Sequence, residues 1–293
     1  MLSKCAVLLG ALLLALSIMP MLAQTAAGTG SAMETVALRT EAMVPRQHRP
    51  RVVAPGTPAP VYDPVRNVTV SYNTIWAGYA VTGTGFTYVQ GSWIVAAVDC
   101  TKTPGTDSSE WVGIDGWSSN TVEQIGTDAD CNGKTPSYYV WYEFYPLNTV
   151  VIRDVSIAAG DKFSASVTYE GSNKYLVAIT NETTGQGFSK EVEFKGADGS
   201  GVPPRNSAEW IEEMDGNKLS DFGVDPFGTL FTGVSTGVDE ATDSSISGTI
   251  TDFGSAVQES ISTQTGSSTG KDTAVPTALA SDGASFKVAW KSE

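Results

Sequence analysis

The chain has 293 residues, enough to bury a large core, and its 30 glycines indicate many turns. Its formal net charge of −14 argues against nucleic acid or an anionic membrane as a partner. With a single histidine and no glycine-rich phosphate loop or dinucleotide fingerprint, the sequence predicts neither a metal site nor a cofactor.

Residues 1–23 have the pattern of a secretory signal peptide. Lys4 precedes an apolar run at residues 6–18, and residues 21–23 offer a small residue for cleavage. The run is too short for a comfortable membrane anchor, so we expect a secreted, extracellular protein.

The cysteines agree with an exported protein. Cys5 lies inside the signal peptide and would leave with it. Cys100 and Cys131 then remain, and an oxidising compartment favours one disulfide between them.

Residues 24–66, which we call the leader, are predicted to be a propeptide or a linker. Six prolines interrupt this stretch and argue against any regular element. Residues 1–66 contain six lysines and arginines against three acidic residues, so the acidic charge lies in residues 67–293. We therefore favour a basic propeptide that rests on an acidic body. Low pH would release it by neutralising the carboxylates with which it pairs.

The remainder, residues 67–293, is predicted to be one all-β domain. Short segments rich in aromatic and β-branched residues are separated by glycine-containing turns, without a long helical period. The predicted strands lie at residues 76–81, 86–95, 111–114, 137–145, 150–155, 162–169, 175–180 and 188–194. Residues 247–251 and 285–290 also alternate and are predicted to close the same domain. The pattern is typical of an antiparallel sandwich or barrel.

One stretch of this domain, residues 206–214, gathers three carboxylates, Glu209, Glu212 and Glu213, beside an indole. Neighbouring side chains of a strand point to opposite faces, so Glu212 and Glu213 cannot both face water if one face is covered. A buried carboxylate is costly unless it has a partner or a chemical task. The stretch is therefore a candidate for an active site.

Elimination narrows the possible chemistry. His48 lies in the leader, so the domain itself contains no Ser-His or Cys-His catalytic unit. The Asp-Thr-Gly or Asp-Ser-Gly turns of a paired-aspartate protease are also missing. Carboxylates, amides and aromatic side chains remain. Carboxylates catalyse proton transfer best near their own pKa, which is roughly 4.3 for an unperturbed Glu.

Five motifs occur in the same order as in the glutamic peptidases, or eqolisins, which the sequence therefore resembles. It is most similar in appearance to the bacterial branch of that family. The five motifs are Phe-Thr-Tyr-Val-Gln-Gly-Ser-Trp at 86–93, Trp-Val-Gly-Ile-Asp-Gly at 111–116, Thr-Val-Glu-Gln-Ile-Gly at 121–126, Tyr-Tyr-Val-Trp-Tyr-Glu-Phe-Tyr-Pro at 138–146 and Ala-Glu-Trp-Ile-Glu-Glu at 208–213. The resemblance covers roughly residues 68–290. It implies a two-sheet antiparallel β-sandwich of the jelly-roll or concanavalin-like kind, and an endopeptidase active at acidic pH.

The resemblance also implies a catalytic pair, Glu213 and Gln124. Glu213 would activate water and protonate the leaving amine, and Gln124 would stabilise the tetrahedral oxyanion. The reverse order, with protonated Glu213 acting first as an acid, stays open. The family normally has an apolar residue where this chain has Glu212. Further residues match positions that support the pair or the substrate: Asp115, Trp111, Glu143, Tyr145 and, from its place in the same strand, Glu209.

Other interpretations stand beside these. Glu143 is equally read as a structural buried carboxylate, and Asp115 as a turn residue before Gly116. A carbohydrate-binding, lectin-like β-sandwich and a cell-surface domain without a site are the rival functions. As partners we expect protein or peptide substrates and the chain's own propeptide. We expect the protein to be a monomer that binds neither nucleic acid nor a membrane.

Overall fold

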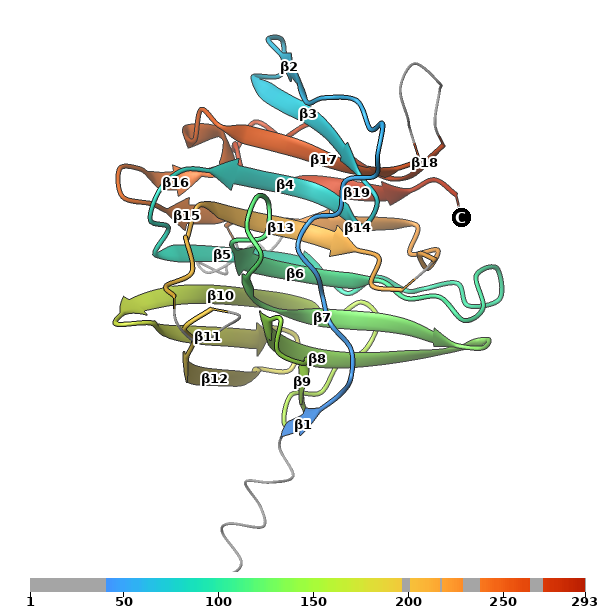
Figure 1. Ribbon diagram of the computed structural model, residues 1–293. Helices are drawn as coiled ribbons and strands as arrows, with labels where there is room; N and C mark the ends of the chain where they lie inside the picture. Colours follow the sequence, from blue (N-terminus) through green and yellow to red (C-terminus); the bar gives the residue numbers. More distant parts are fainter. Residues whose placement is uncertain (1–40, 197–200, 217, 229–237, 264–270, 293) are drawn as a thin grey trace, which may run out of the picture.

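The computed structural model describes residues 41–196, 201–216, 218–228, 238–263 and 271–292 (Figure 1). The predicted signal peptide and the first part of the leader lie outside these ranges. Within them, no helix has the length and apolar character needed to cross a membrane.

The regular secondary structure of the described residues is β-strand throughout, apart from one short 3-10 turn, η1 (Ile250–Asp252). The strands of the first half are β1 (Glu41–Met43), β2 (Val61–Asp63), β3 (Val68–Asn73), β4 (Trp76–Thr82), β5 (Tyr88–Ile94), β6 (Ser109–Ile114), β7 (Val122–Asn132), β8 (Thr135–Tyr145) and β9 (Val150–Ile152). Those of the second half are β10 (Lys162–Gly171), β11 (Lys174–Asn181), β12 (Gln186–Glu193), β13 (Ser207–Glu213), β14 (Val224–Phe227), β15 (Glu240–Thr242), β16 (Ser247–Thr249), β17 (Ala256–Ser262), β18 (Asp272–Pro276) and β19 (Phe286–Trp290).

The pairings form two runs of strands. The first run has the order β2-β3-β17-β4-β13-β6-β7-β8-β9-β1 and is antiparallel except where β17 pairs with β3. The second runs β12-β11-β10-β5 and continues through β14, β19 and β18. Strand β15 also pairs with β5, and β16 pairs with β15. Strand β18 pairs with the end of β17 and so joins the two runs.

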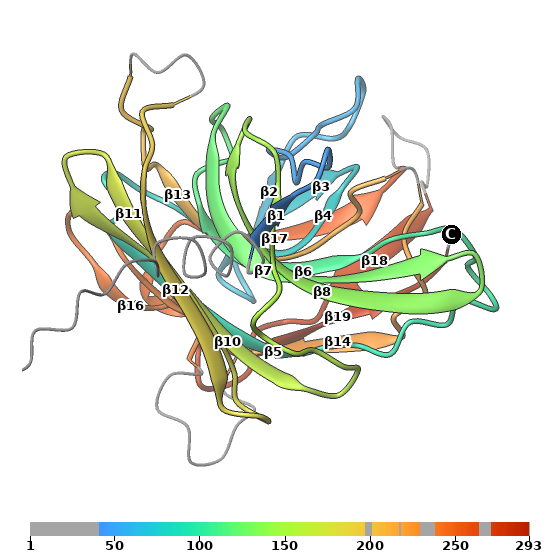
Figure 2. The ribbon, with the colours of Figure 1, turned by 90° about the horizontal axis from the view of Figure 1, so that it is seen from below.

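The main core lies between the two runs, where β6 and β7 face β5 and β10 (Figure 2). Val112 and Ile125 of the first run and Trp93 and Val167 of the second are buried there. A smaller apolar cluster covers the opposite face of the first run. It consists of Ile75, Trp76, Trp111, Val122, Trp141 and Ile211. The leader contacts this second cluster at Trp141 and Trp76.

The all-β, antiparallel prediction is confirmed, and every strand expected from the sequence is present within a few residues. The finer jelly-roll or concanavalin-like layout stays a prediction. The closing strands correspond to β16 and β19, and Cys100 and Cys131 form the expected disulfide. The expectation that prolines exclude regular structure from the leader was wrong. Strand β1 ends before Pro45, the first proline of the leader, and β2 lies between Pro60 and Pro64, so each three-residue strand pairs without a proline in the ladder.

Candidate active site

Glu213 is the last residue of β13, on the face that carries the smaller apolar cluster. The alternation of the strand puts it on the same side as Ile211, while Glu212 lies with Trp210 on the core side. Its carboxylate accepts a hydrogen bond from Trp111 Nε1 on the neighbouring strand β6, at 2.9 Å to Oε2. Glycine is required opposite that indole, because a Cβ at Gly126 would lie 2.6 Å from the Cβ of Trp111.

Gln124 reaches the same face from β7, two strands away from β13. It pairs with Gly113 of β6 on one side and with Glu143 of β8 on the other. The long strand β7 was not among the strands expected from the sequence, although its first residues were read as a motif. Its polar residues Gln124 and Asp128 are wholly buried, which the sequence pattern alone does not reveal.

The leader runs across this face, over β8, β7, β6, β13 and β4, between β1 and β2 (Figure 1). The backbone of the leader meets both members of the predicted pair at one peptide bond. Gln124 Nε2 donates to the carbonyl oxygen of His48 at 2.8 Å, and the Arg49 N–H donates to Glu213 Oε1 at 3.2 Å. Both predicted catalytic side chains are 0% exposed with the leader in place.

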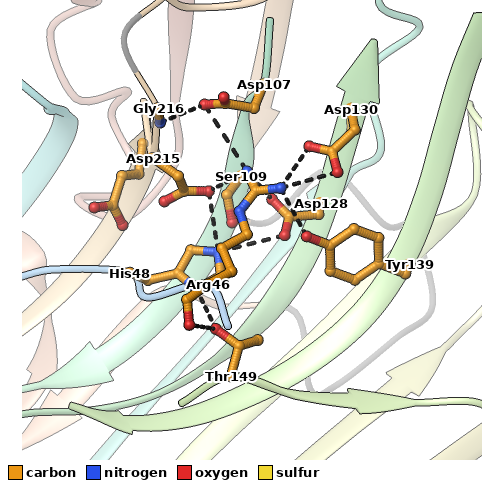
Figure 3. Close-up of polar contacts among 12 residues, drawn as sticks. Arg46, His48, Asp107, Ser109, Asp128, Asp130, Tyr139, Thr149, Asp215 and Gly216 are labelled. Atoms are coloured by element: carbon orange, nitrogen blue, oxygen red, sulfur yellow. Dashed lines mark hydrogen bonds and ion pairs between the residues drawn. The ribbon is translucent and has the colours of Figure 1, made fainter. Parts of the chain in front are cut away.

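His48 fills a pocket beside that peptide bond. Its ring stacks on Trp141 with centroids 3.6 Å apart and planes 5° from parallel. Its Nε2 lies 3.1 Å from Asp215 Oδ2 and 3.4 Å from Asp128 Oδ2, and its Nδ1 lies 3.2 Å from Glu143 Oε2. Figure 3 shows the imidazole beside Asp128 and Asp215. The pocket therefore combines a flat aromatic wall with an acidic rim, a combination that suits a flat cation.

Arg46 binds next to His48 and is surrounded by carboxylates from three parts of the fold (Figure 3). Its guanidinium contacts Asp130 at 2.7 Å and Asp215 at 2.7 Å, and it donates to the Tyr139 hydroxyl at 2.8 Å. The carboxylates of Asp128 and Asp107 lie 3.5 and 3.8 Å from Nη2 of the same guanidinium. We call the four acidic residues around Arg46 the cleft carboxylates: Asp107, Asp128, Asp130 and Asp215.

The pKa shifts result from this crowding of charge. Burial raises the pKa of Glu213 well above its ordinary value, and Asp215 adds to the effect while His48 opposes it. Burial disfavours the imidazolium of His48, yet Asp215 and Asp128 raise its pKa well above 6.5. Burial also opposes ionisation of Asp128, but Arg46 and His48 outweigh it and lower the pKa of Asp128. Charged His48 and ionised Asp128 thus stabilise each other.

Two groups of side chains in the described part of the chain bring possible metal ligands within 4.8 Å of one another. The first is His48, Asp128 and Asp215, where the raised pKa of His48 makes it a cation rather than a ligand. The second is Glu110, Glu212 and Asp225, which we call the core carboxylates; they come from β6, β13 and β14 and are all 0% exposed. Burial raises the pKa of Glu110 to about 7 and those of Glu212 and Asp225 well above their ordinary values.

The motifs and the fold can be compared with those of known families. The family model of the peptidase A4 family matches residues 74–277, which is well over half of the chain. The chain belongs to the peptidase A4 family. The resemblance to the glutamic peptidases drawn from the motifs is thereby confirmed.

Two curated members of this family give the extent of the likeness. Aspergillopepsin-2 of Aspergillus niger is 30% identical over 184 residues, which cover 53% of this chain and 63% of the relative. The match therefore spans less than two thirds of aspergillopepsin-2. Scytalidopepsin B of Scytalidium lignicola is 31% identical over 197 residues, which cover 64% of this chain and 71% of the relative.

Solved structures of peptidase A4 relatives share the fold. Scytalido-glutamic peptidase with a transition-state-analogue inhibitor superposes with a TM-score of 0.57 at 22% identity, covering 74% of this chain and 98% of that one. SCP-B, a member of the eqolisin family in complex with the tripeptide Ala-Ile-His, gives a TM-score of 0.54 at 21% identity with the same coverages.

Within this peptidase A4 chain the predicted supporting residues occupy different places. Trp111 contacts Glu213, and Glu143 accepts the His48 N–H at 3.0 Å. Tyr145 packs at the edge of the smaller apolar cluster. Asp115, in a left-handed conformation with φ 73°, accepts the N–H groups of Arg205 and Asn206, both at 2.8 Å, just before β13 begins. These two hydrogen bonds fix the start of β13, the strand that carries Glu213.

Glu209 shares the strand face of Glu213 by alternation, and its predicted role as a neighbour that raises the pKa of Glu213 stays a prediction. Burial and Asp115 raise the pKa of Glu209 well above its ordinary value. The like-charged groups that act on Glu213 are Asp215 and Glu143.

Sequence reasoning missed the cleft carboxylates and the place of His48 and Arg46. The signal for Asp128 and Asp130 was present, because they continue the Gln124 strand with alternate spacing. No local pattern indicated Asp107 or Asp215, which lie outside the strands and reach Arg46 only through the tertiary fold.

Proposed function

We propose that the protein is a secreted acid endopeptidase of the glutamic type, in which Glu213 and Gln124 act on the scissile peptide bond. Membership of the peptidase A4 family supports this function over the carbohydrate-binding alternative. The observation that carries it is the placement of Gln124 and Glu213 at the carbonyl and the N–H of a single peptide bond.

Each position suits its proposed task. An amide N–H₂ at 2.8 Å from a carbonyl oxygen stabilises the negative charge that develops there when water attacks. Glutamine does not titrate, so it keeps this role at low pH. A carboxyl group beside the amide nitrogen is where the leaving amine must receive its proton. Trp111 holds the carboxyl group in that orientation.

Peptides are the substrates that relatives support. Structures of relatives hold a peptide-like transition-state analogue and the tripeptide Ala-Ile-His. In this chain an extended segment of the protein itself lies over the predicted pair. We also propose that residues 1–23 direct export, that residues 24–66 form a propeptide and that the mature protein acts as a monomer.

The test is digestion of a denatured protein near pH 4, about the ordinary pKa of Glu. We expect Glu213→Gln to abolish cleavage, and Gln124→Ala to lower kcat by about 100- to 1,000-fold, as loss of an oxyanion donor does elsewhere. Glu191→Gln and Gln186→Ala, both exposed on β12, are the matched controls and should cleave normally.

Inhibition by a metal chelator, or unchanged cleavage by Glu213→Gln, would contradict the proposal. Binding of an oligosaccharide with no proteolysis at any pH would favour the lectin-like alternative.

A further inference from the structure

The leader lies in the cleft in the manner of an extended peptide held through its backbone. The His48 N–H donates to Glu143 Oε2 at 3.0 Å, and Trp76 Nε1 donates to the Arg49 carbonyl oxygen at 3.1 Å. Farther along, the Arg51 N–H donates to the Gly116 carbonyl at 3.1 Å. Such contacts on both sides of one peptide bond are what a cleft for polypeptide needs, since they do not depend on the side chains.

The side chains before the bond fix its register. His48 is wholly buried between Trp141 and the carboxylates of Asp128, Asp215 and Glu143. Arg46, two residues earlier, makes its ion pairs with the cleft carboxylates. A shift of the leader by one residue would remove both cations from these contacts, so the His48–Arg49 bond is the one presented to the predicted pair.

The two sides of this bond are attached to the fold in different ways. After it, Arg51 Nε lies 3.0 Å from Glu259, whose side chain is 0% exposed, and the guanidinium stacks on Trp117. Strand β2 then pairs with β3. Before the bond, the leader is held by the ion pairs of His48 and Arg46 and by the three-residue strand β1 on β9.

We propose that the chain matures by cutting its own His48–Arg49 peptide bond, so that the mature protein begins at Arg49. This inference rests on the proposed function. Water adds to the carbonyl carbon of His48, and its proton passes through Glu213 to the nitrogen of Arg49. The C–N bond then breaks, leaving a carboxylate on His48 and a free amine on Arg49.

The cut itself loosens the upstream fragment. It creates a new carboxylate at His48, whose own N–H binds Glu143 and whose former amide partner Arg49 binds Glu213, and like charges in a buried site repel each other. The downstream part keeps the anchors of Arg51 and β2. Residues 41–48 are therefore the part that leaves and opens the cleft.

The first experiment incubates the full chain near pH 4 and determines the N-terminal sequence and intact mass of the product. We expect Arg49 as the new N-terminus, with a rate independent of protein concentration, because the bond lies in the chain's own cleft. The Glu213→Gln chain should stay uncut. A different N-terminus in a preparation that digests other proteins would overturn the inference while leaving the proposed function standing.

Two variants at the bond sharpen the test. Arg49→Pro removes the N–H that donates to Glu213 and makes the amide tertiary, so its product should not begin at residue 49. Arg49→Ala keeps the N–H and changes only an exposed side chain, so it should be cut like the parent chain. Equal cutting of both variants at this bond, or of Glu213→Gln and the parent chain, would contradict self-cleavage by this site.

A synthetic peptide with the sequence of residues 44–53 tests the same bond in a substrate that does not need to fold. The mature enzyme should cut it between the histidine and the following arginine. Replacing that histidine by alanine should lower kcat/KM at least tenfold. The substrate would then lack the imidazolium that stacks on Trp141 and pairs with the surrounding carboxylates. An enzyme that digests denatured protein but leaves the parent peptide intact, or cuts both peptides equally well, would refute the assignment.

Discussion

At the scale of single residues, the alternation along β13 gives two adjacent glutamates opposite surroundings. Glu213 meets Trp111 and the leader, while Glu212 joins the core carboxylates on the other face. Both are buried and both have raised pKa values, chiefly through burial. What separates them chemically is the hydrogen-bond donor at Trp111 and the peptide bond in reach of Glu213.

The indole of Trp111 should tune the acidity of Glu213 in the mature enzyme. A hydrogen bond to the ionised carboxylate favours ionisation, so Trp111→Phe removes that help and raises the pKa of Glu213. We expect the acid limb of the pH profile of kcat/KM to move upward by about one pH unit. Trp76→Phe also loses an indole in the smaller apolar cluster but makes no bond to Glu213, and should leave the limb in place. An unmoved limb in Trp111→Phe would refute the tuning.

At the scale of elements, the leader acts as an extra segment laid over β8, β7, β6, β13 and β4 (Figure 1). Its charged contacts explain why a basic segment precedes an acidic body. Arg46 meets the cleft carboxylates and favours their ionised forms: burial raises the pKa values of Asp107 and Asp130 to about 6, and the charge of Arg46 opposes that rise. Its hold on the fold is therefore sensitive to pH.

A peptide of residues 41–48 should inhibit the mature enzyme in a pH-dependent way. The binding of Arg46 and His48 lowers the pKa of Asp128 below its ordinary 3.8, so this part of the affinity is present above that value. It is lost as the pH falls through the lowered pKa. We expect Ki to be higher near pH 2 than near pH 5.

Within that peptide, Arg46→Ala should raise Ki at pH 5 by roughly tenfold or more, equivalent to about 1.4 kcal/mol, and weaken the pH dependence. The control is Gln47→Ala, whose side chain bonds the Pro146 carbonyl away from the cleft carboxylates. It should keep the pH dependence. A Ki that falls with falling pH would contradict the electrostatic account of the leader.

At the scale of the whole molecule, burial of carboxyl groups adapts the fold to acid. The core carboxylates lie between the two runs of strands, and Glu123 and Asp239 are likewise 0% exposed with raised pKa values caused mainly by burial. Neutral carboxylic acids are tolerated in such places far better than carboxylates. The same groups that are harmless at low pH destabilise the fold when they ionise.

The stability of the protein should therefore fall as the pH rises. A carboxyl group whose pKa is raised in the folded state stabilises it fully below the unfolded pKa. That contribution is lost as the pH rises through the folded pKa, which is about 7 for Glu110. Each unit of pKa shift corresponds to about 1.4 kcal/mol. We expect the unfolding temperature of the Glu213→Gln protein, chosen to avoid self-digestion, to be highest near pH 4 and several degrees lower at pH 8.

Glu212→Gln, made in the same Glu213→Gln background, isolates the core carboxylates. It cannot ionise, so the loss of unfolding temperature between pH 4 and pH 8 should become smaller. Glu191→Gln, on an exposed strand, should leave the loss unchanged. An unfolding temperature that rises from pH 4 to pH 8 in the parent would show that other groups control the stability.

Much of the strand pattern was readable because side-chain alternation and aromatic content are local properties. The segments around Trp111, Tyr142 and Val177 were found for this reason. The polar strands β7 and β17 were not predicted from the sequence. Carboxylates and amides occupy buried positions in these strands, where a recognisable alternation would have apolar residues. The short strands of the leader were excluded wrongly, because pairing with β9 and β3 overrides the weak local preference.

The sequence by itself indicated the all-β fold, the family and the candidate pair, because the residue types and spacings within each motif are local properties of the chain. Only the tertiary structure decided that Gln124 and Glu213, on strands separated by β6, meet at one peptide bond of the leader. It alone brought His48 against Trp141 and Arg46 among the cleft carboxylates. These contacts join residues about 80 to 170 positions apart, and such distances are set by strand order and register, which no local pattern contains.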